Sequence, residues 1–148
     1  MLFGAGLSYA YLSPSFGPGV GALGAALSSL AISLVVNRLI DGLGHRRRNG
    51  QVVRSALTHS VFTAPAWGLG SVYAMWLALS WPGLWGHALE VPVLVAGALA
   101  ACSHLLLDSL TEGGVFFTTK RVALAHFRSR NVLLNGVFVV LGLAFFAL

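Results

Sequence analysis

Four long apolar runs, separated by short polar segments, dominate this 148-residue sequence. The runs cover residues 20–40, 59–81, 91–110 and 132–148. A helix needs about 20 apolar residues to cross the hydrocarbon core of a bilayer, so runs of this length are typical of spanning helices. The pattern predicts an all-α fold, with residues 1–148 forming a single membrane domain. We expect an integral membrane bundle of about four transmembrane helices.

A shorter apolar segment, residues 1–12, precedes these runs and ends in a stretch rich in Ser, Pro and Gly. It is too short to cross a bilayer. It also lacks the basic start and the small-residue cleavage site of a secretory signal. We therefore expect this segment to stay in the protein as a short interfacial or re-entrant segment.

Composition and charge placement fit the same class of protein. Hydrophobic residues make up 57% of the chain and charged residues only 9%, whereas about 25% of a typical soluble domain is charged. All nine Lys and Arg residues lie within 38–54 and 120–130. The positive-inside rule then predicts a multi-pass protein of the cell membrane, with both basic segments cytoplasmic and both chain ends outside. This topology accounts for the net charge of +5, so we expect the lipid bilayer rather than nucleic acid as partner. A homo-oligomer is left open.

Polar residues recur at a spacing of four where the first and third runs end. Asn37, Asp41 and His45 follow one another in this way, and so do His104 and Asp108. Residues four apart lie on one face of a helix. Ionisable groups in membrane helices usually face the bundle interior and serve a function. Both pairs are therefore expected on the cytoplasmic side, facing each other.

These pairs, together with the histidine that opens the second run, form a candidate metal site. The candidate ligands are Asp41, His45, His59, His104 and Asp108. Imidazole and carboxylate together suit zinc, with manganese or iron as alternatives. Up to five ligands exceed the four of a closed structural zinc site. Two ions are held, or some residues bind one ion while the others orient ligands or act as a base.

Two further residues are candidates for catalytic roles. Arg54 precedes His59 and is placed to bind a phosphate beside the metal through a charge-assisted contact. The topology signal alone would also explain this arginine. Glu112 lies one turn beyond Asp108 and is a candidate ligand or general base, although a solvated carboxylate at a helix end is the alternative.

Local signals suggest how these segments are arranged. Thr58 is a candidate helix cap before His59, and Pro65 is expected to bend the second helix and tip His59 toward its partners. Residues 115–130 alternate basic and apolar positions, which predicts an amphipathic surface helix or a charged loop. Asn131 is a candidate cap of the last helix.

Three elements carry a resemblance to a known family: Asp41-Gly-Leu-Gly-His45, Arg54-Ser-Ala-Leu-Thr-His59-Ser60, and His104-Leu-Leu-Leu-Asp108-Ser-Leu-Thr111 followed by Gly113-Gly114. In these the sequence resembles the membrane-bound metal-dependent hydrolases of bacteria (YdjM-like proteins) and their archaeal branch. The resemblance implies an integral-membrane hydrolase whose metal is held by these aspartates and histidines. The sequence departs from the bacterial pattern because its start has no histidine and Gly44 stands before His45. The His-x-x-x-Asp element is also similar to the zinc-ligand helices of phospholipase C and its nuclease relatives.

The expected function is therefore a membrane-embedded, metal-dependent hydrolase. It would act on a phosphorus ester, in a phospholipid-type headgroup or another phosphodiester, through metal-activated water. The first alternative is a non-catalytic membrane scaffold or envelope protein whose metal site joins the helices. A small ion transporter is the second, because His and Asp within a membrane can relay ions.

Overall fold

Helices form most of the structure, as the apolar runs predict. The computed structural model describes residues 1–17, 19–48, 51–81, 87–128 and 130–147. The elements in chain order are α1 (Leu2–Phe16), α2 (Val20–Gly44), β1 (His45–Arg48), β2 (Gln51–Arg54), α3 (Ala64–Ser80), a 3-10 turn (His87–Leu89), α4 (Glu90–Ser109), β3 (Val115–Phe117), β4 (Lys120–Val122) and α5 (Val132–Phe145).

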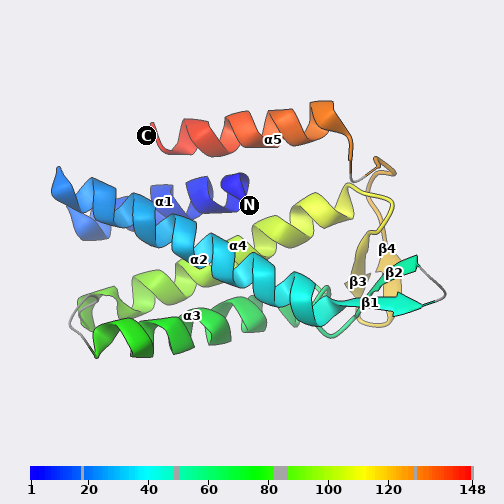
Figure 1. Cartoon of the computed structure of the whole chain (residues 1–148), viewed down its shortest axis with the longest axis horizontal. Coiled ribbons are helices and arrows are strands. Elements are labelled where there is room, and N and C mark those ends of the chain that lie inside the picture. Colours follow the sequence, from blue (N-terminus) through cyan, green and yellow to red (C-terminus); the bar gives the residue numbers. More distant parts are fainter. Residues whose placement is uncertain (18, 49–50, 82–86, 129, 148) are drawn as a thin grey trace.

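Helices α2 and α4 cross near the centre of the molecule (Figure 1). Helix α3 packs against both of them on one side, α1 packs against both on the other, and α5 lies on α1. The two antiparallel hairpins, β1–β2 and β3–β4, lie together at the end where α2 and α4 finish (Figure 1). The chain segments after α2 and α4 are thus at one end of the bundle.

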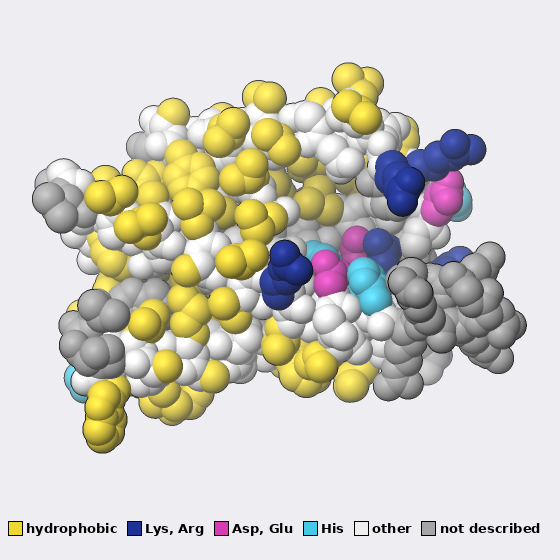
Figure 2. Space-filling view, viewed as in Figure 1, with side chains coloured by type: hydrophobic (Ala, Val, Ile, Leu, Met, Phe, Trp, Pro, Cys, Tyr) yellow, Lys and Arg dark blue, Asp and Glu magenta, His cyan; other side chains and the backbone are white. Residues whose placement is uncertain are grey.

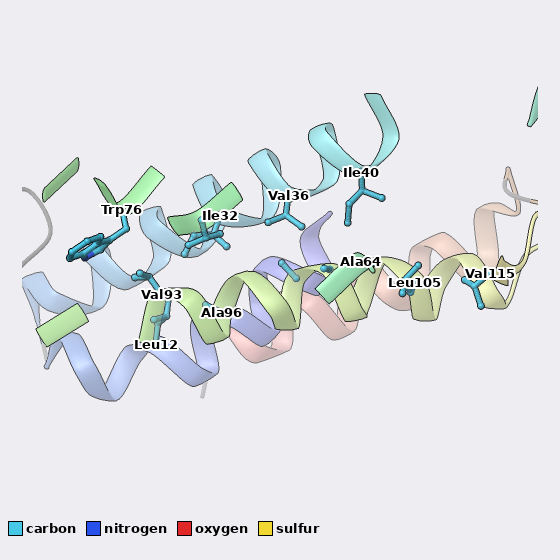
Figure 3. Packing of buried hydrophobic residues seen from close by; sticks show 13 residues of the cluster. Leu12, Ile32, Val36, Ile40, Ala64, Trp76, Val93, Ala96, Leu105 and Val115 are labelled. Carbon is cyan, nitrogen blue, oxygen red and sulfur yellow. The ribbon is translucent and has the colours of Figure 1, made fainter. Parts of the chain in front are cut away.

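Small residues bring the helices close together along a narrow core. In the layer drawn in Figure 3, Ile32, Val36 and Ile40 follow one another along α2, and Val93, Ala96 and Leu105 follow one another along α4. At the crossing of α3 and α4, a side chain on Gly68 would overlap the backbone of Gly97. Such contacts between small residues let two helix backbones approach closely, as in membrane helix pairs.

The expectation of four spans is met only in part. Helices Gly21–Gly44 and His87–Ser109 are long and apolar enough to cross a membrane, with 24 and 23 residues. Helix α3 has 17 residues because it starts at Ala64 and not at His59. Pro65 lies in its first turn, where a missing N–H costs nothing, so this proline begins the helix instead of bending it. Helix α5 starts as expected but has only 14 residues.

Residues 1–12 belong to a longer helix that packs inside the bundle. Helix α1 contacts α2, α4 and α5, and the buried Ser8 hydroxyl donates to the carbonyl of Ala96 at 3.1 Å. The segment is thus part of a 15-residue helix, which runs back along α2 in Figure 1. Its interfacial or re-entrant placement in the membrane stays a prediction.

The expected surface helix within 115–130 is not found in the described residues, 115–128 and 130. The start of this segment forms the hairpin β3–β4, with Val115 opposite Val122, because its aromatic and β-branched residues favour strands. Nothing in the prediction indicated β1–β2 either, although the Asn-Gly pair at 49–50 is a strong hairpin signal in the sequence. The cap of α5 is confirmed, since the Asn131 side chain accepts a hydrogen bond from the Leu134 N–H at 3.0 Å.

Candidate metal centre

The structure brings together all five residues that the sequence proposes as ligands. Asp41 lies in the last turn of α2, and His45 directly follows that helix. His104 and Asp108 lie on the last turns of α4, and His59 lies in the turn segment between β2 and α3. Since the C-terminal ends of α2 and α4 both point to this region, their dipoles add negative potential that favours a cation.

Four side-chain atoms form a ring in which carboxylate oxygens alternate with imidazole nitrogens. Asp41 Oδ1 lies 3.7 Å from His59 Nε2 and 3.3 Å from His104 Nε2. Asp108 Oδ2 lies 3.5 Å from His59 Nε2 and 3.4 Å from His104 Nε2. Ligand atoms about 2.1 Å from a tetrahedral ion lie about 3.4 Å from one another. Neighbouring atoms of the ring therefore have the spacing of two ligands on one ion.

Three of these four atoms are buried and have no hydrogen-bond partner in the described structure: His59 Nε2, His104 Nε2 and Asp108 Oδ2. A buried polar atom without a partner costs about 1–3 kcal/mol, and more when it is charged. Three such atoms facing one point would destabilise the folded protein if nothing were bound between them. A cation at that point would satisfy all of them.

The other ring nitrogen of His59 and of His104 is held by a neighbour. His104 Nδ1 lies 2.5 Å from Asn37 Oδ1. This oxygen can only accept, so Nδ1 carries the proton and Nε2 presents its lone pair to the centre. His59 Nδ1 lies 2.9 Å from Thr58 Oγ1. Thr58 thus orients a histidine, and no helix cap by it is seen. Such outer contacts are typical of histidines that bind metals.

Strand β3 fixes the position of His59. The Phe116 N–H donates to the His59 carbonyl at 2.8 Å, and the Val61 N–H donates back to the Phe116 carbonyl at 3.0 Å. His59 is fully buried. A hairpin far along the sequence therefore holds the third ligand-bearing segment beside α2 and α4.

His45 lies at the rim of the cluster. Its Nε2 is 3.6 Å from Asp41 Oδ1, and its ring stacks on that of His59 with 5.1 Å between centroids. Partial burial lowers the pKa of His45 below its usual value, an effect that the Asp41 carboxylate opposes. Two overlapping ligand groups result: Asp41 with His45 and His59, and His59 with His104 and Asp108. His59 Nε2 can bind only one ion. His45 is therefore either a fifth ligand of that ion or a side chain that lies beside the four ring residues without binding it.

Arg54 lies next to the centre, but its guanidinium is already engaged. Its Nη2 donates to Asp108 Oδ1 at 2.7 Å, and its Nη1 donates to the Gly114 carbonyl at 3.0 Å and to Thr111 Oγ1 at 3.3 Å. A side chain on Gly113 would overlap this guanidinium. These contacts favour a role of Arg54 in orienting Asp108 over a role in binding substrate. The orientation of Asp108 turns its Oδ2 atom toward the ring.

The remaining catalytic candidate lies elsewhere. Glu112 is exposed, its N–H donates to the Phe127 carbonyl, and it belongs to neither ligand group. Helix α4 ends at Ser109, so Glu112 does not continue the face that carries His104 and Asp108. A spacing of four aligns residues only while the helix lasts.

A cleft of about 570 Å³ opens beside the ring, between α2 and α4. Its lining includes Asn37, Arg38, Asp41, His104 and Asp108, together with Met1, Leu34, Gly42 and Leu107. In Figure 2 the acidic and histidine side chains of this region are visible from outside, next to the apolar surface of the helices. The ring can therefore be reached by a ligand, and we call this hollow the α2–α4 cleft.

Comparison with known proteins places the chain in a family. The family described as "Protein of unknown function (DUF1286)" matches residues 2–107. The chain belongs to the DUF1286 family. No curated protein and no solved structure matches it. The part of this DUF1286 protein that matches contains Asp41, His45, His59 and His104, and it ends one residue before Asp108.

Gly44 is required by the close approach of two segments of this DUF1286 protein. A side chain at this position would overlap both the Thr58 hydroxyl and the His59 ring. We expect Gly44→Ala to displace His59 and to weaken metal binding at least tenfold, measured by competition with a chelating dye. Gly42→Ala is the matched control, because a side chain there meets nothing. Equal affinities of the two variants would contradict the assigned role of Gly44.

Proposed function

We propose that the protein is a membrane-embedded, metal-dependent hydrolase that acts on a phosphorus ester. The observation that carries the proposal is the ring of two aspartates and two histidines, whose three buried and unpartnered atoms converge beside an open cleft. A bound divalent ion would polarise the ester and lower the pKa of a water in the cleft. Asp41, His59, His104 and Asp108 are the proposed ligands, with zinc as the first candidate ion and manganese or iron as alternatives.

The membrane assignment rests on the surface of the helices. In each of the two long helices, only 39% of the most apolar 18-residue window is buried. Exposed leucines cover the outside of α2 and α4, among them Leu23, Leu27, Leu34 and Leu106, and Figure 2 shows this apolar surface over most of the visible face. Soluble monomers rarely expose such large apolar areas. We propose a multi-pass protein in which α3 and α5 complete a four-span bundle, with tilting or local thinning of the bilayer around these shorter helices.

The proposed orientation follows from the basic residues. Both basic segments lie at the end of the bundle that carries the ring (Figure 1). The positive-inside rule then puts this end on the cytoplasmic side. In this arrangement the α2–α4 cleft would open near the inner leaflet.

The residues around the ring would prepare the site for catalysis. Asn37 and Thr58 orient the two buried imidazoles, and Arg54 holds Asp108. Asp41 is the most exposed member of the ring, with 45% of its side chain accessible, so we propose that it adjoins the reacting water. His45 beside it would complete the shell or accept a proton at the rim.

A structural metal site is the second candidate. Four ligand atoms are the full complement of a closed zinc site, and an ion there would join α2, α4 and the segment before α3. A scaffold of this kind would lose thermal stability on removal of the metal but would turn over no ester.

One preparation of the protein can distinguish a hydrolase from a scaffold with a structural metal site. Detergent-purified protein is stripped with a chelator, reloaded with zinc, manganese or iron(II), and assayed with bis(4-nitrophenyl) phosphate, a soluble phosphodiester. We expect turnover that disappears on stripping and returns on reloading, and that is lost in Asp41→Ala but kept in His126→Ala, an exposed histidine outside the ring. Stoichiometric metal and a lowered melting temperature on stripping, without turnover of diester, monoester or lipid, would reject the hydrolase in favour of the scaffold.

A further inference from the structure

The lining of the α2–α4 cleft is partly polar and partly apolar. It includes the ring residues Asp41, His104 and Asp108 with Arg38, and also Leu34 and Leu107. A cleft for a small polar ester would need no apolar wall at its mouth. A cleft for an amphiphile needs both a polar and an apolar lining, because the headgroup and the chain of the amphiphile are recognised by different contacts.

Arg38 is a free cation at this cleft. It is exposed and forms no ion pair or hydrogen bond with other described residues. The two ring aspartates would neutralise a divalent ion, while Arg54 and Arg38 add positive charge nearby. The loaded cleft would therefore be cationic and would attract an anion. A guanidinium binds phosphate well because its N–H groups match two of the oxygens.

One face of α2 connects the cleft with the apolar exterior. Leu23, Leu27, Leu34, Arg38 and Asp41 lie within about 60° of one another around the helix at 100° per residue. The three leucines are exposed, from 61% at Leu23 to 44% at Leu34. An acyl chain that lies along these leucines would thus have its headgroup at Arg38 and its phosphorus next to the ring.

We propose, on the basis of the proposed function, that the ligand of the cleft is a lipid phosphate that enters sideways from the bilayer. Arg38 binds its phosphate, Leu34 contacts the first part of its acyl chain, and the leucine face of α2 guides the rest. The cleft would thereby select a lipid-borne ester over the same ester dissolved in water.

The experiment measures binding by the zinc-loaded full chain in detergent. The probes are dioleoyl phosphatidic acid, dioleoylglycerol, which has the same chains without phosphate, and inorganic phosphate. We expect phosphatidic acid to bind at least tenfold more tightly than either of the others. Arg38→Gln should weaken its binding at least tenfold, whereas Lys120→Gln, an exposed cation on β4, should change it less than twofold.

A second pair of variants tests the path of the chain. Leu34→Ser should weaken the binding of phosphatidic acid at least threefold and leave that of inorganic phosphate unchanged. Leu141→Ser on α5 is the control, because Leu141 has the same 44% exposure. Equal effects of the two serine variants, equal effects of Arg38→Gln and Lys120→Gln, or equal binding of phosphatidic acid and inorganic phosphate would overturn the proposal.

The binding assay also separates this proposal from the proposed function. A protein that binds phosphatidic acid through Arg38 and Leu34 but hydrolyses no ester would refute only the hydrolase. A protein that hydrolyses the soluble diester but shows no preference for the lipid would refute only the lipid ligand.

Discussion

Replacing His59 or His104 by alanine is expected to abolish metal binding by the purified protein. Each variant removes one of four ring atoms that lie 3.3–3.7 Å from their neighbours. The three ligands that remain cannot close the shell around the ion. Elemental analysis after dialysis should find less than about a tenth of the wild-type metal in either variant.

The controls separate loss of a ligand from loss of the fold. His126→Ala removes an exposed histidine outside the ring and should keep the wild-type metal content. Because His59 is fully buried, His59→Gln serves as a variant of similar volume. Asn37→Leu keeps all ligands but removes the acceptor of His104 Nδ1, so its affinity should fall about 10- to 100-fold, as for other outer-shell contacts. Full retention of metal in both alanine variants would reject the site.

Removal of the Arg54 guanidinium is expected to lower the free energy of unfolding of the protein strongly. Arg54→Met leaves Asp108 Oδ1, Thr111 Oγ1 and the Gly114 carbonyl without their donor. Both charged side chains are largely buried, with 16% and 12% accessible. Breaking one partner of a buried ion pair costs about 3–5 kcal/mol, because the other charge stays buried and unpaired. Unfolding of the metal-free protein in a denaturing detergent would measure this loss.

The same experiment has an internal check on the cause. Arg38→Met removes an exposed arginine that has no ion-pair partner among the described residues, so it should change the free energy of unfolding by less than about 1 kcal/mol. Adding Asp108→Asn to Arg54→Met removes the unpaired charge and should recover part of the stability. If Arg54→Met and Arg38→Met were equally stable, the ion pair with Asp108 would have no structural role.

The sequence could bring four of the five candidate ligands together in pairs because the signal was local. Asp41 and His45, like His104 and Asp108, are four residues apart, and each pair lies where an apolar run ends. A helix turns such spacing into a shared face, whatever the rest of the chain does. Asn37 could be placed inward by the same argument. The predominantly helical class followed from the length of the apolar runs.

The length of the helices was harder to predict because apolar character does not determine where a helix begins. Residues 59–63 belong to the same apolar run as α3, but they form a turn, and α3 begins beside Pro65. His59 is held by strand β3, and β3 lies in a segment whose alternating pattern suggested a surface helix or a charged loop. Glu112 belongs to neither ligand group for a related reason, because the helix that carries Asp108 ends at Ser109.

By itself, the sequence determined which residue types could bind a cation, that two pairs of them would lie where two helices end, and that these ends would be followed by the basic segments. All of these are properties of neighbours in the chain. Only the tertiary structure decided that Arg54 is engaged by Asp108, that Gly44 makes room for His59, and that Arg38 borders an open cleft without a partner among the described residues. These facts depend on which side chains meet across α2, α4 and the β3–β4 hairpin, and contacts between distant segments arise only when the whole chain has packed.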